Sequence, residues 1–414
     1  MSQRLTSKAS VSAGSDRWQS LNRQQKLQIF AGACAIAISV GLIRSDFGIV
    51  AELMVKESWI QSREIGFLAA LNMLGFLLGS FHQSQIRHQY EIKLCLTLAV
   101  LVGFISLLLA GLNAGLIGEA MLRVTAGWSG GHLLGGIPSL ALTGLPSAWR
   151  RRASAAVLGG GGAGGLIGAA AIAQHRIATA SSSWEALAVI NLLLAAPVLW
   201  LIRTMQLQEF QQESEHSLSV EDSGGGTGRQ RRRLLWLLGI GLFLAGAGRV
   251  PLFVYEPLVE SHALGASGAI SIGFAGSGAL LASVLLVLLP ASIATHWMLP
   301  LTAAVGLSGM AVYATASSLP AFLVTGFLLG AWGVSISSCT LAQLPRLTSV
   351  SSRRRIWALF TTLQSLSFLL FSMLTAPLAD GRLTQLLQLG LVVFVVQLIV
   401  ELLYAWKLRH CLVV

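Results

Sequence analysis

Residues 93–112 read KLCLTLAVLVGFISLLLAGL, a run of twenty residues whose only charge is at its first position. About twenty largely apolar residues are what a helix needs to span the hydrocarbon core of a membrane. The whole chain has this character, because 54% of its 414 residues are hydrophobic and only 11% are charged. Soluble domains carry roughly 25% charged residues. The chain is therefore a polytopic membrane protein and not a soluble protein with one anchor.

The same search along the chain predicts twelve membrane spans. We interpret them as helices, because long continuous apolar runs differ from the short alternating segments of a β-barrel. They lie at about residues 27–50, 64–81, 93–112, 115–140, 153–173, 185–204, 234–257, 268–290, 297–317, 320–342, 356–378 and 384–406.

The basic residues predict the orientation of these spans. The chain carries 28 Lys and Arg and a net charge of +11. If the N-terminus lies in the cytoplasm, the inner segments hold 21 of these residues, the outer loops hold four, and three lie within spans. Basic residues concentrate in cytoplasmic loops. Both termini are therefore expected in the cytoplasm, and the positive charge is explained without nucleic acid.

The longest polar stretch divides the spans six and six. Residues 205–233 are acidic first, then glycine-rich and finally basic, a composition that is typical of a flexible linker. The sequence thus predicts a tail at 1–26, a six-helix bundle at 27–204, a linker at 205–233, a second six-helix bundle at 234–406 and a tail at 407–414, with tails and linker cytoplasmic.

Two short matches indicate that the halves are repeats. Gly41-Leu-Ile-Arg44 in the first span corresponds to Gly246-Ala-Gly-Arg249 in the seventh, 205 residues later. The triple arginine at 150–152 corresponds to the one at 353–355, 203 residues later. Two parallel six-helix halves related by an axis along the membrane normal form the arrangement of the major facilitator transporters.

Three segments resemble the YbfB-like branch of that superfamily. Leu71-Asn-Met-Leu-Gly-Phe-Leu-Leu-Gly-Ser80 resembles its second-helix pattern Asn-Tyr-x-Gly-Tyr-x-x-Gly. Gly41-Leu-Ile-Arg44-Ser-Asp-Phe47 is similar to its first-helix stretch Gly-x-Gly-Arg-Phe-x-Tyr, and the glycine-dense fifth helix is similar too. The resemblance implies a monomeric secondary transporter that works by alternating access, and it implies little about the cargo.

The loop after the second span departs from the superfamily. Its usual pattern is Gly-x-x-x-Asp-Arg-x-Gly-Arg-Lys, whereas Gly79-Ser-Phe-His-Gln-Ser-Gln-Ile-Arg87 contains no Asp. Only Arg87 is left as a gating partner for the dipole of a neighbouring helix, which puts the usual cytoplasmic gate in doubt.

Three arginines, Arg44, Arg123 and Arg249, lie inside spans. Each is about 9–12 Å below the outer surface at 1.5 Å per residue, and the resemblance places helices one, four and seven around a central cavity. A buried charge costs about 2.5–3.5 kcal/mol on insertion scales, so it needs a counter-charge, water or an anionic ligand. We expect the three to converge on substrate. The alternative is structural ion pairing, for which Glu119 precedes Arg123 by four residues.

Asp46 and Glu119 are the candidate proton carriers. Burial favours a neutral carboxyl group and a nearby arginine favours the carboxylate, so a group balanced between the two can load and release a proton. The alternative role for Asp46 is a hydrogen bond between helices.

The remaining candidates are weaker. Polar and aromatic residues within spans either contact substrate or join neighbouring helices, and small residues let helices pack closely and slide. The substrate-binding candidates of this kind are Asn72, Trp128, Tyr255 and Gln364, and the packing candidates are Gly160, Gly164 and Gly168. The four cysteines are scattered, and no HExxH, Cys/His cluster or nucleophile–base pair occurs, so no cofactor, metal or enzymatic activity is predicted.

The sequence therefore predicts a proton-coupled secondary transporter of the bacterial inner membrane, for a small anionic or amphipathic organic solute. Its partners would be the solute, protons and the lipid bilayer. One alternative is an efflux carrier for lipophilic or cationic compounds, in which the arginines are structural and the acids contact cargo. Another is a scaffold or sensor that keeps the fold without transport.

Overall fold

The computed structural model describes residues 21–174, 179–204, 225–256, 259–260, 264, 269–289, 295–375, 378 and 382–412. Within these residues the chain is helical and contains no strand. The elements are α1 (Arg23–Ile36), η2 (Ala37–Ser45), α2 (Phe47–Lys56), α3 (Ser62–Gln85), α4 (Gln89–Ala110), α5 (Gly115–Ala141), α6 (Ser147–Gln174), α7 (Ala180–Thr204), α9 (Gly225–Gly248), η3 (Pro251–Tyr255), α11 (Ala269–Leu288), α12 (Thr295–Ala314), α13 (Leu319–Leu347), α14 (Val350–Thr375) and α15 (Leu383–Leu412).

The twelve predicted spans are confirmed. The first consists of α1, η2 and α2 together, and the seventh of α9 and η3. Ten of the helical runs in the described chain are long and apolar enough to cross a membrane, and Gly273–Leu288 is a shorter apolar helix. The fourth span, α5, is more polar because it contains a glutamate, an arginine, a histidine and several glycines.

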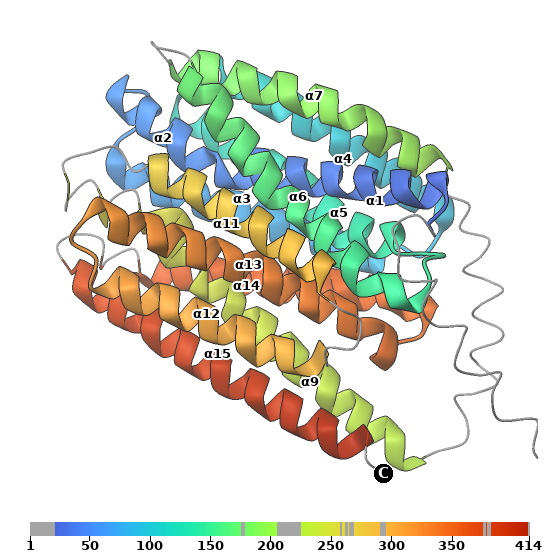
Figure 1. Cartoon of the computed structure of the whole chain (residues 1–414). Helices are drawn as coiled ribbons and strands as arrows, with labels where there is room; N and C mark the ends of the chain where they lie inside the picture. The colour runs from blue at the N-terminus through green and yellow to red at the C-terminus, as the bar shows by residue number, and fades with distance from the viewer. Residues whose placement is uncertain are drawn as a thin grey trace, which may run out of the picture.

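The two six-helix halves lie side by side with their helices roughly parallel (Figure 1). Two sets of contacts join them: α6 packs against α11 and α13, and α3 and α5 pack against α14. These contacts are related by the repeat, because α6 and α14 are the fifth and eleventh spans. The first half thus contacts the second along two equivalent interfaces, and a site can lie between the two halves.

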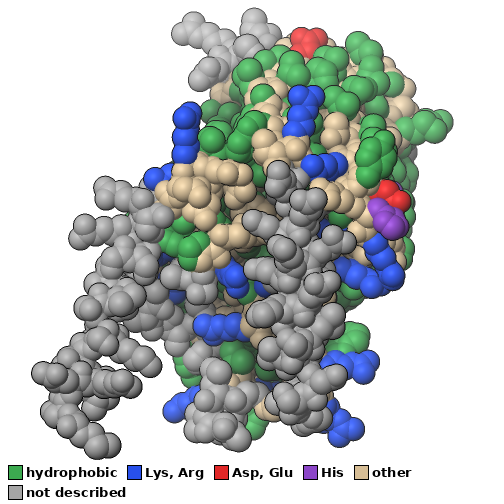
Figure 2. All heavy atoms as spheres, turned by 90° about the vertical axis from the view of Figure 1, so that its right-hand side faces the viewer, with side chains coloured by type: hydrophobic (Ala, Val, Ile, Leu, Met, Phe, Trp, Pro, Cys, Tyr) green, Lys and Arg blue, Asp and Glu red, His purple; other side chains and the backbone are tan. Residues whose placement is uncertain are grey.

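The start of α1 and the end of α15 lie at one end of the molecule, which we call the terminal end (Figure 1). Lys and Arg side chains gather on this end and acidic ones are few (Figure 2). The sequence predicts that this end is cytoplasmic. The tail residues 1–20 and most of the linker, 205–224, lie outside the described residues. Helix α9 already begins at Gly225 and α15 continues to Leu412, so the helices extend into the predicted linker and C-terminal tail.

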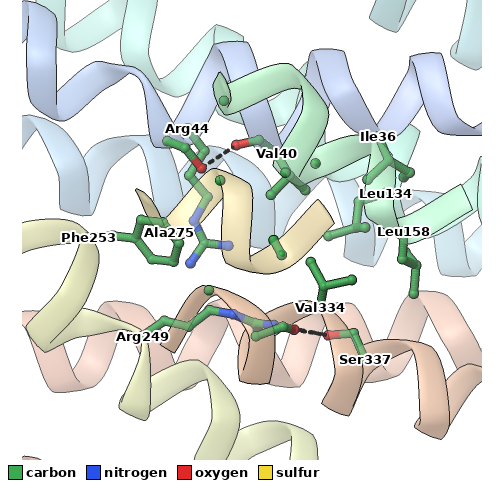
Figure 3. A pocket seen from close by; sticks show the side chains of 18 of the residues that line it. Ile36, Val40, Arg44, Leu134, Leu158, Arg249, Phe253, Ala275, Val334 and Ser337 are labelled. Atoms are coloured by element: carbon green, nitrogen blue, oxygen red, sulfur yellow. Dashed lines mark hydrogen bonds between the residues drawn. The ribbon is translucent and has the colours of Figure 1, made fainter. Parts of the chain in front are cut away.

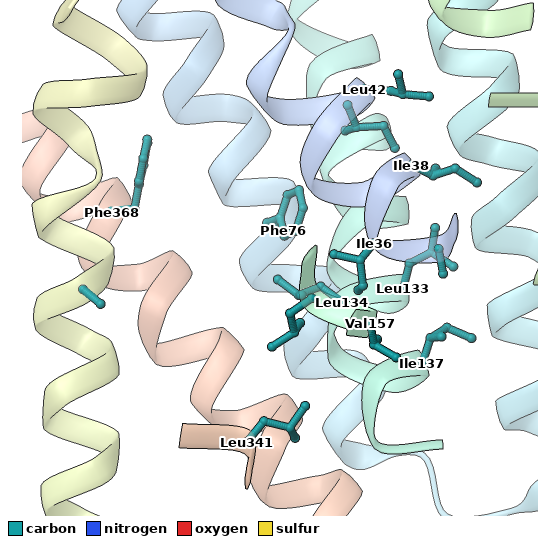
Figure 4. Close-up of a cluster of buried hydrophobic side chains, with 14 of the residues drawn as sticks. Ile36, Ile38, Leu42, Phe76, Leu133, Leu134, Ile137, Val157, Leu341 and Phe368 are labelled. Atoms are coloured by element: carbon teal, nitrogen blue, oxygen red, sulfur yellow. The ribbon is translucent and has the colours of Figure 1, made fainter. Parts of the chain in front are cut away.

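Glycines set how closely the first half packs. A Cβ at Gly160 or Gly164 of α6 would run into the backbone of the first span at Ala33 or Ala37. The predicted packing role of these two glycines therefore has a clear geometric basis. Around this contact lies a cluster of buried apolar side chains that includes Ile36 (Figure 4). Lipid is as apolar as these side chains, so close van der Waals packing has to hold the helices together.

The first and seventh helices are both interrupted by π-helical turns beside an arginine. Arg44 lies within η2, and Arg249 lies two residues before the start of η3. In the seventh helix the cause is Pro251, which has no N–H for the helical ladder. Such π-helical turns occur frequently at functional sites. The equivalent position of the two interruptions supports the repeat and directs attention to the two arginines.

Gly160→Ala should destabilise the protein. Its new methyl group would meet the Ala33 backbone, and overpacking of this kind costs about 1–3 kcal/mol. The measurement is the thermal unfolding midpoint in detergent. Gly66→Ala is the control, because no described residue from another part of the fold lies within 4 Å of the added Cβ and alanine is a better helix former. Equal midpoints for both variants would show that the α6 contact is not tight.

Candidate functional site

A cavity lies between the two halves, lined by residues of the first, fourth, fifth, seventh, eighth, tenth and eleventh spans. Figure 3 shows Arg44, Arg249 and Phe253 toward one end and Ile36, Leu134, Leu158 and Val334 toward the other. The cavity therefore has an arginine end and an apolar end, and helices of both halves contribute to each.

Arg44 is enclosed by aromatic rings. Its guanidinium carbon lies 4.6 Å from the ring centre of Phe368, 5.6 Å from that of Phe253 and 6.0 Å from that of Phe76. Its Nε and Nη2 atoms are buried and bond to no described residue. Ring faces attract a cation, but they accept none of the in-plane N–H bonds of a guanidinium. Arg44 thus lines the cavity with a guanidinium whose covered Nε and Nη2 have no acceptor among the described residues.

Arg249, by contrast, is held in place. Its Nη2 donates to the carbonyl of Gly333 and, at 3.0 Å, to the hydroxyl of Ser337, both on α13. The ring centre of Trp332 lies 5.6 Å from its guanidinium carbon. Neither partner is charged, so Arg249 keeps its full positive charge.

The cavity is electropositive. Arg44 and Arg249 come from opposite halves and lie close enough to repel each other electrostatically. No acidic residue occurs among the described residues that line the cavity. Two uncompensated positive charges in a site shielded from water favour an anionic ligand.

Arg123 does not line this cavity in the described structure. It is fully buried within the first half, 4.4 Å from the ring centre of Trp184 and 5.1 Å from that of Phe47. Glu119 lies one turn away, yet neither side chain hydrogen-bonds to a described residue. Asn72 donates to the Arg123 carbonyl at 3.1 Å and so joins α3 to α5. Of the three intramembrane arginines, the structure brings together two.

Asp46 lies directly behind the cavity wall. It is fully buried, and its carboxyl group packs where a Cβ on Gly168 would have to go and beside Gly165, which lines the cavity. Both carboxyl oxygens lack a hydrogen-bond partner among the described residues. The alternative role of a helix–helix hydrogen bond is therefore not seen here.

The remaining predicted residues divide between cavity and scaffold. Gln364 lines the cavity. Trp128 packs on His132, with ring centres 4.3 Å apart. The hydroxyl of Tyr255 donates to the Ser372 carbonyl at 3.5 Å. The described cavity lining includes neither aromatic residue, so both serve packing in this conformation.

The terminal end is closed by two arginines that sequence analysis did not select. Arg354 of α14 donates to the carbonyls of Gln83, at 2.9 Å, and Ile86 at the end of α3. Arg151 of α6 donates to the carbonyl of Leu289 at the end of α11, at 2.6 Å. Each bond joins one half to the other.

These bonds repeat within the chain. Arg151 and Arg354 are 203 residues apart, as are their acceptors Ile86 and Leu289. Each arginine is the middle member of a triple run. In the sequence these runs mark the internal repeat, and that repetition is the one feature that points to this role. Arg87, the predicted gating residue, is exposed beside the end of α3. The loop after α3 lacks the usual Asp, and here Arg354 of α14 makes the contact with the end of α3.

Comparison with known proteins agrees with this architecture. A family model described as "Uncharacterised MFS-type transporter YbfB" matches residues 36–402. The chain belongs to this family. It is therefore a membrane transporter of the major facilitator superfamily and not an enzyme.

Solved structures of the superfamily share the fold of this transporter. One is the proton:xylose symporter XylE bound to 6-bromo-6-deoxy-D-glucose, with 17% identity, a TM-score of 0.66, and coverage of 92% of this chain and 94% of that one. A double-tryptophan mutant of XylE gives 16% identity, a TM-score of 0.68 and the same coverage. No curated protein sequence matches the chain.

Arg354→Ala should open the terminal end more often. Charge-assisted hydrogen bonds contribute about 1.5–3 kcal/mol each, so their loss shifts the equilibrium roughly tenfold or more. The measurement is the alkylation rate of a cysteine placed at Ser80, which is buried between α3 and α14, in a background without native cysteines. The exposed neighbour provides the control, Arg355→Ala. Equal rates in both variants would contradict the role of Arg354.

Arg44→Gln and Arg249→Gln should affect stability in opposite ways. Arg44 has buried donors without partners, so its neutral replacement leaves the unfolding midpoint unchanged or raises it. Arg249→Gln loses two hydrogen bonds to α13 and lowers the midpoint. Thermal unfolding of the ligand-free protein measures both. A large loss in Arg44→Gln would instead assign this residue a structural role.

Proposed function

We propose that this transporter moves small organic anions across the bacterial inner membrane as a monomer, with both termini in the cytoplasm. The observation that carries the proposal is the pair Arg44 and Arg249, which come from opposite halves and face one cavity. An anion bound between them contacts both halves at once. Its binding energy can therefore favour the rocking of one half against the other.

We further propose that protons drive the transport. Asp46 is two residues from Arg44 on the same interrupted helix, and its carboxyl group lies behind the cavity wall at Gly165. A buried carboxyl group without hydrogen-bond partners is suited to hold a proton when the cavity is closed and to release it when water enters. Glu119 is the second candidate. The similar fold of a proton:xylose symporter supports coupling to protons.

The apolar end of the cavity favours one other function, efflux of lipophilic compounds. Ile36, Leu134, Leu158 and Val334 would accommodate such a cargo. The two arginines at the other end oppose cationic cargo, because like charges repel in a site shielded from water. An anionic cargo uses both ends, so we prefer it. A scaffold or sensor role makes no use of the unpaired donors of Arg44.

Asp46→Asn should separate substrate movement from proton movement. The test uses proteoliposomes with a pH-sensitive dye inside, and permanently charged organic sulfonates and quaternary ammonium ions outside. In the wild type a transported sulfonate moves protons. In Asp46→Asn the proton signal is lost, because an asparagine side chain cannot take up and release a proton. Exchange of labelled for unlabelled sulfonate continues, because the substitution leaves the arginines in place.

Two results would contradict the proposal. Transport of the quaternary ammonium ions without any sulfonate would exclude anion cargo. Sulfonate transport with no proton signal in the wild type would exclude proton coupling. Glu119→Gln tests the second acid in the same way, and Glu91→Gln, on the exposed first turn of α4, is the matched control.

A further inference from the structure

We infer that the cargo is an amphipathic monoanion, with one carboxylate or sulfonate group at Arg44 and a flat apolar body in the opposite end of the cavity. This inference rests on the proposed function and deepens it. The preceding proposal requires only an anion, whereas the cavity geometry also limits the number of charges and the shape of the rest of the molecule.

The unpaired donors of Arg44 define where the anionic group binds. Arg249 already donates to Gly333 and Ser337, whereas the buried Nε and Nη2 of Arg44 donate to no described residue. These two atoms carry parallel N–H groups along one edge of the guanidinium, which is the edge that binds a carboxylate with two hydrogen bonds. This edge of Arg44 therefore takes one anionic group.

The aromatic rings fix how that group approaches. Phe368, Phe253 and Phe76 all lie within 6.0 Å of the Arg44 guanidinium carbon. Ring faces hold the cation without accepting its N–H groups, so the covered edge of the guanidinium still lacks an acceptor, and a ligand reaches it when the rings move apart. The rings also exclude water, which strengthens a charge-assisted hydrogen bond formed there.

The opposite end has nothing to offer a second charge. Its walls are mainly the side chains of Ile36, Leu134, Leu158 and Val334 (Figure 3). Ser337 lies beside them, but its hydroxyl already accepts from Arg249 and donates to the Gly333 carbonyl. Trp357 also lines the cavity, but its indole N–H already donates to the Leu134 carbonyl at 2.9 Å. A second carboxylate would lie there without a partner, and burying an unpaired charge is very costly. A dianion is therefore disfavoured.

Bare backbone shapes the space between the two ends. Gly161 and Gly165 of α6 line the cavity on one side, and Gly330 and Gly333 of α13 line it on the other. The N–H and C=O groups within helices are paired internally, so these walls are smooth and mostly apolar. A planar ring fits between such walls better than a polyol, which needs many hydrogen-bond partners.

The test compares four matched ligands by calorimetry on the purified full chain in detergent. Benzoate has both features, acetate has the charge without the body, benzyl alcohol has the body without the charge, and terephthalate adds a second charge. We expect benzoate, or its larger analogue 2-naphthoate, to bind at least about tenfold more tightly than the other three. Acetate or terephthalate binding as tightly as the aryl monocarboxylates would overturn the inference, and so would a folded protein that binds neither of them at millimolar concentration.

Variants locate the two parts of the ligand. Val334→Thr keeps the side-chain shape but replaces one methyl group by a hydroxyl at the apolar end. It should therefore weaken benzoate binding several-fold and leave acetate binding unchanged. Val324→Thr is the matched control, because it lies on the same helix but faces outward. Arg44→Lys retains the charge and loses the parallel donors, so it should weaken both carboxylates.

The outcomes separate this inference from the proposed function. If terephthalate or a polar anion binds most tightly and Arg44→Lys weakens it, anion transport stands and the monoanion inference fails. If only cations bind, both fail. Equal loss of benzoate binding in Val334→Thr and Val324→Thr would contradict the placement of the ligand's apolar body beside Val334.

Discussion

A permanently charged guanidinium buried in a membrane protein without a hydrogen-bond partner is the constraint on which the rest of this structure depends. Arg44 cannot lose its charge by giving up a proton. Among the described residues, no acid or carbonyl accepts a hydrogen bond from its Nε or Nη2. The fold tolerates it because three phenylalanine rings surround it and because a cavity adjoins it. An arrangement that costs stability in the empty protein is understandable when a ligand supplies the missing acceptor.

The internal repeat explains how such a site is made accessible to two sides of a membrane. The first and seventh helices each contribute an arginine beside a π-helical turn, and the fifth and eleventh helices each contribute an arginine that bonds to a helix end of the other half. The cavity and its closure are thus both shared between the halves. Breaking the two equivalent sets of bonds at the terminal end would let the halves separate there, while the cavity arginines stay on their own halves.

The sequence revealed the architecture well because hydropathy and charge act along the chain. Twelve apolar runs and the position of the basic residues are local properties, and so is an arginine within a span. Which way a side chain faces is not local. Arg123 is recognisable in the sequence as an arginine within a span, yet its side chain packs against Trp184 and Phe47 and does not line the cavity. Arg354 was visible as part of a repeated basic run, but its acceptors, Gln83 and Ile86, lie some 270 residues earlier and are carbonyls that no sequence pattern marks. The π-helical turn η2 at Arg44 contains no proline that would predict it from the sequence, whereas η3, the π-helical turn after Arg249, begins at Pro251.

The central claim is that Arg44 binds the anionic group of a cargo whose apolar body lies at the other end of the cavity. The most direct measurement is a structure of the protein with bound 4-bromobenzoate, in which anomalous scattering locates the bromine. The account predicts the carboxylate at the Nε and Nη2 edge of Arg44 and the bromine among Leu134, Leu158 and Val334. A bromine beside Arg44, or a ligand bound only outside the cavity, would contradict it.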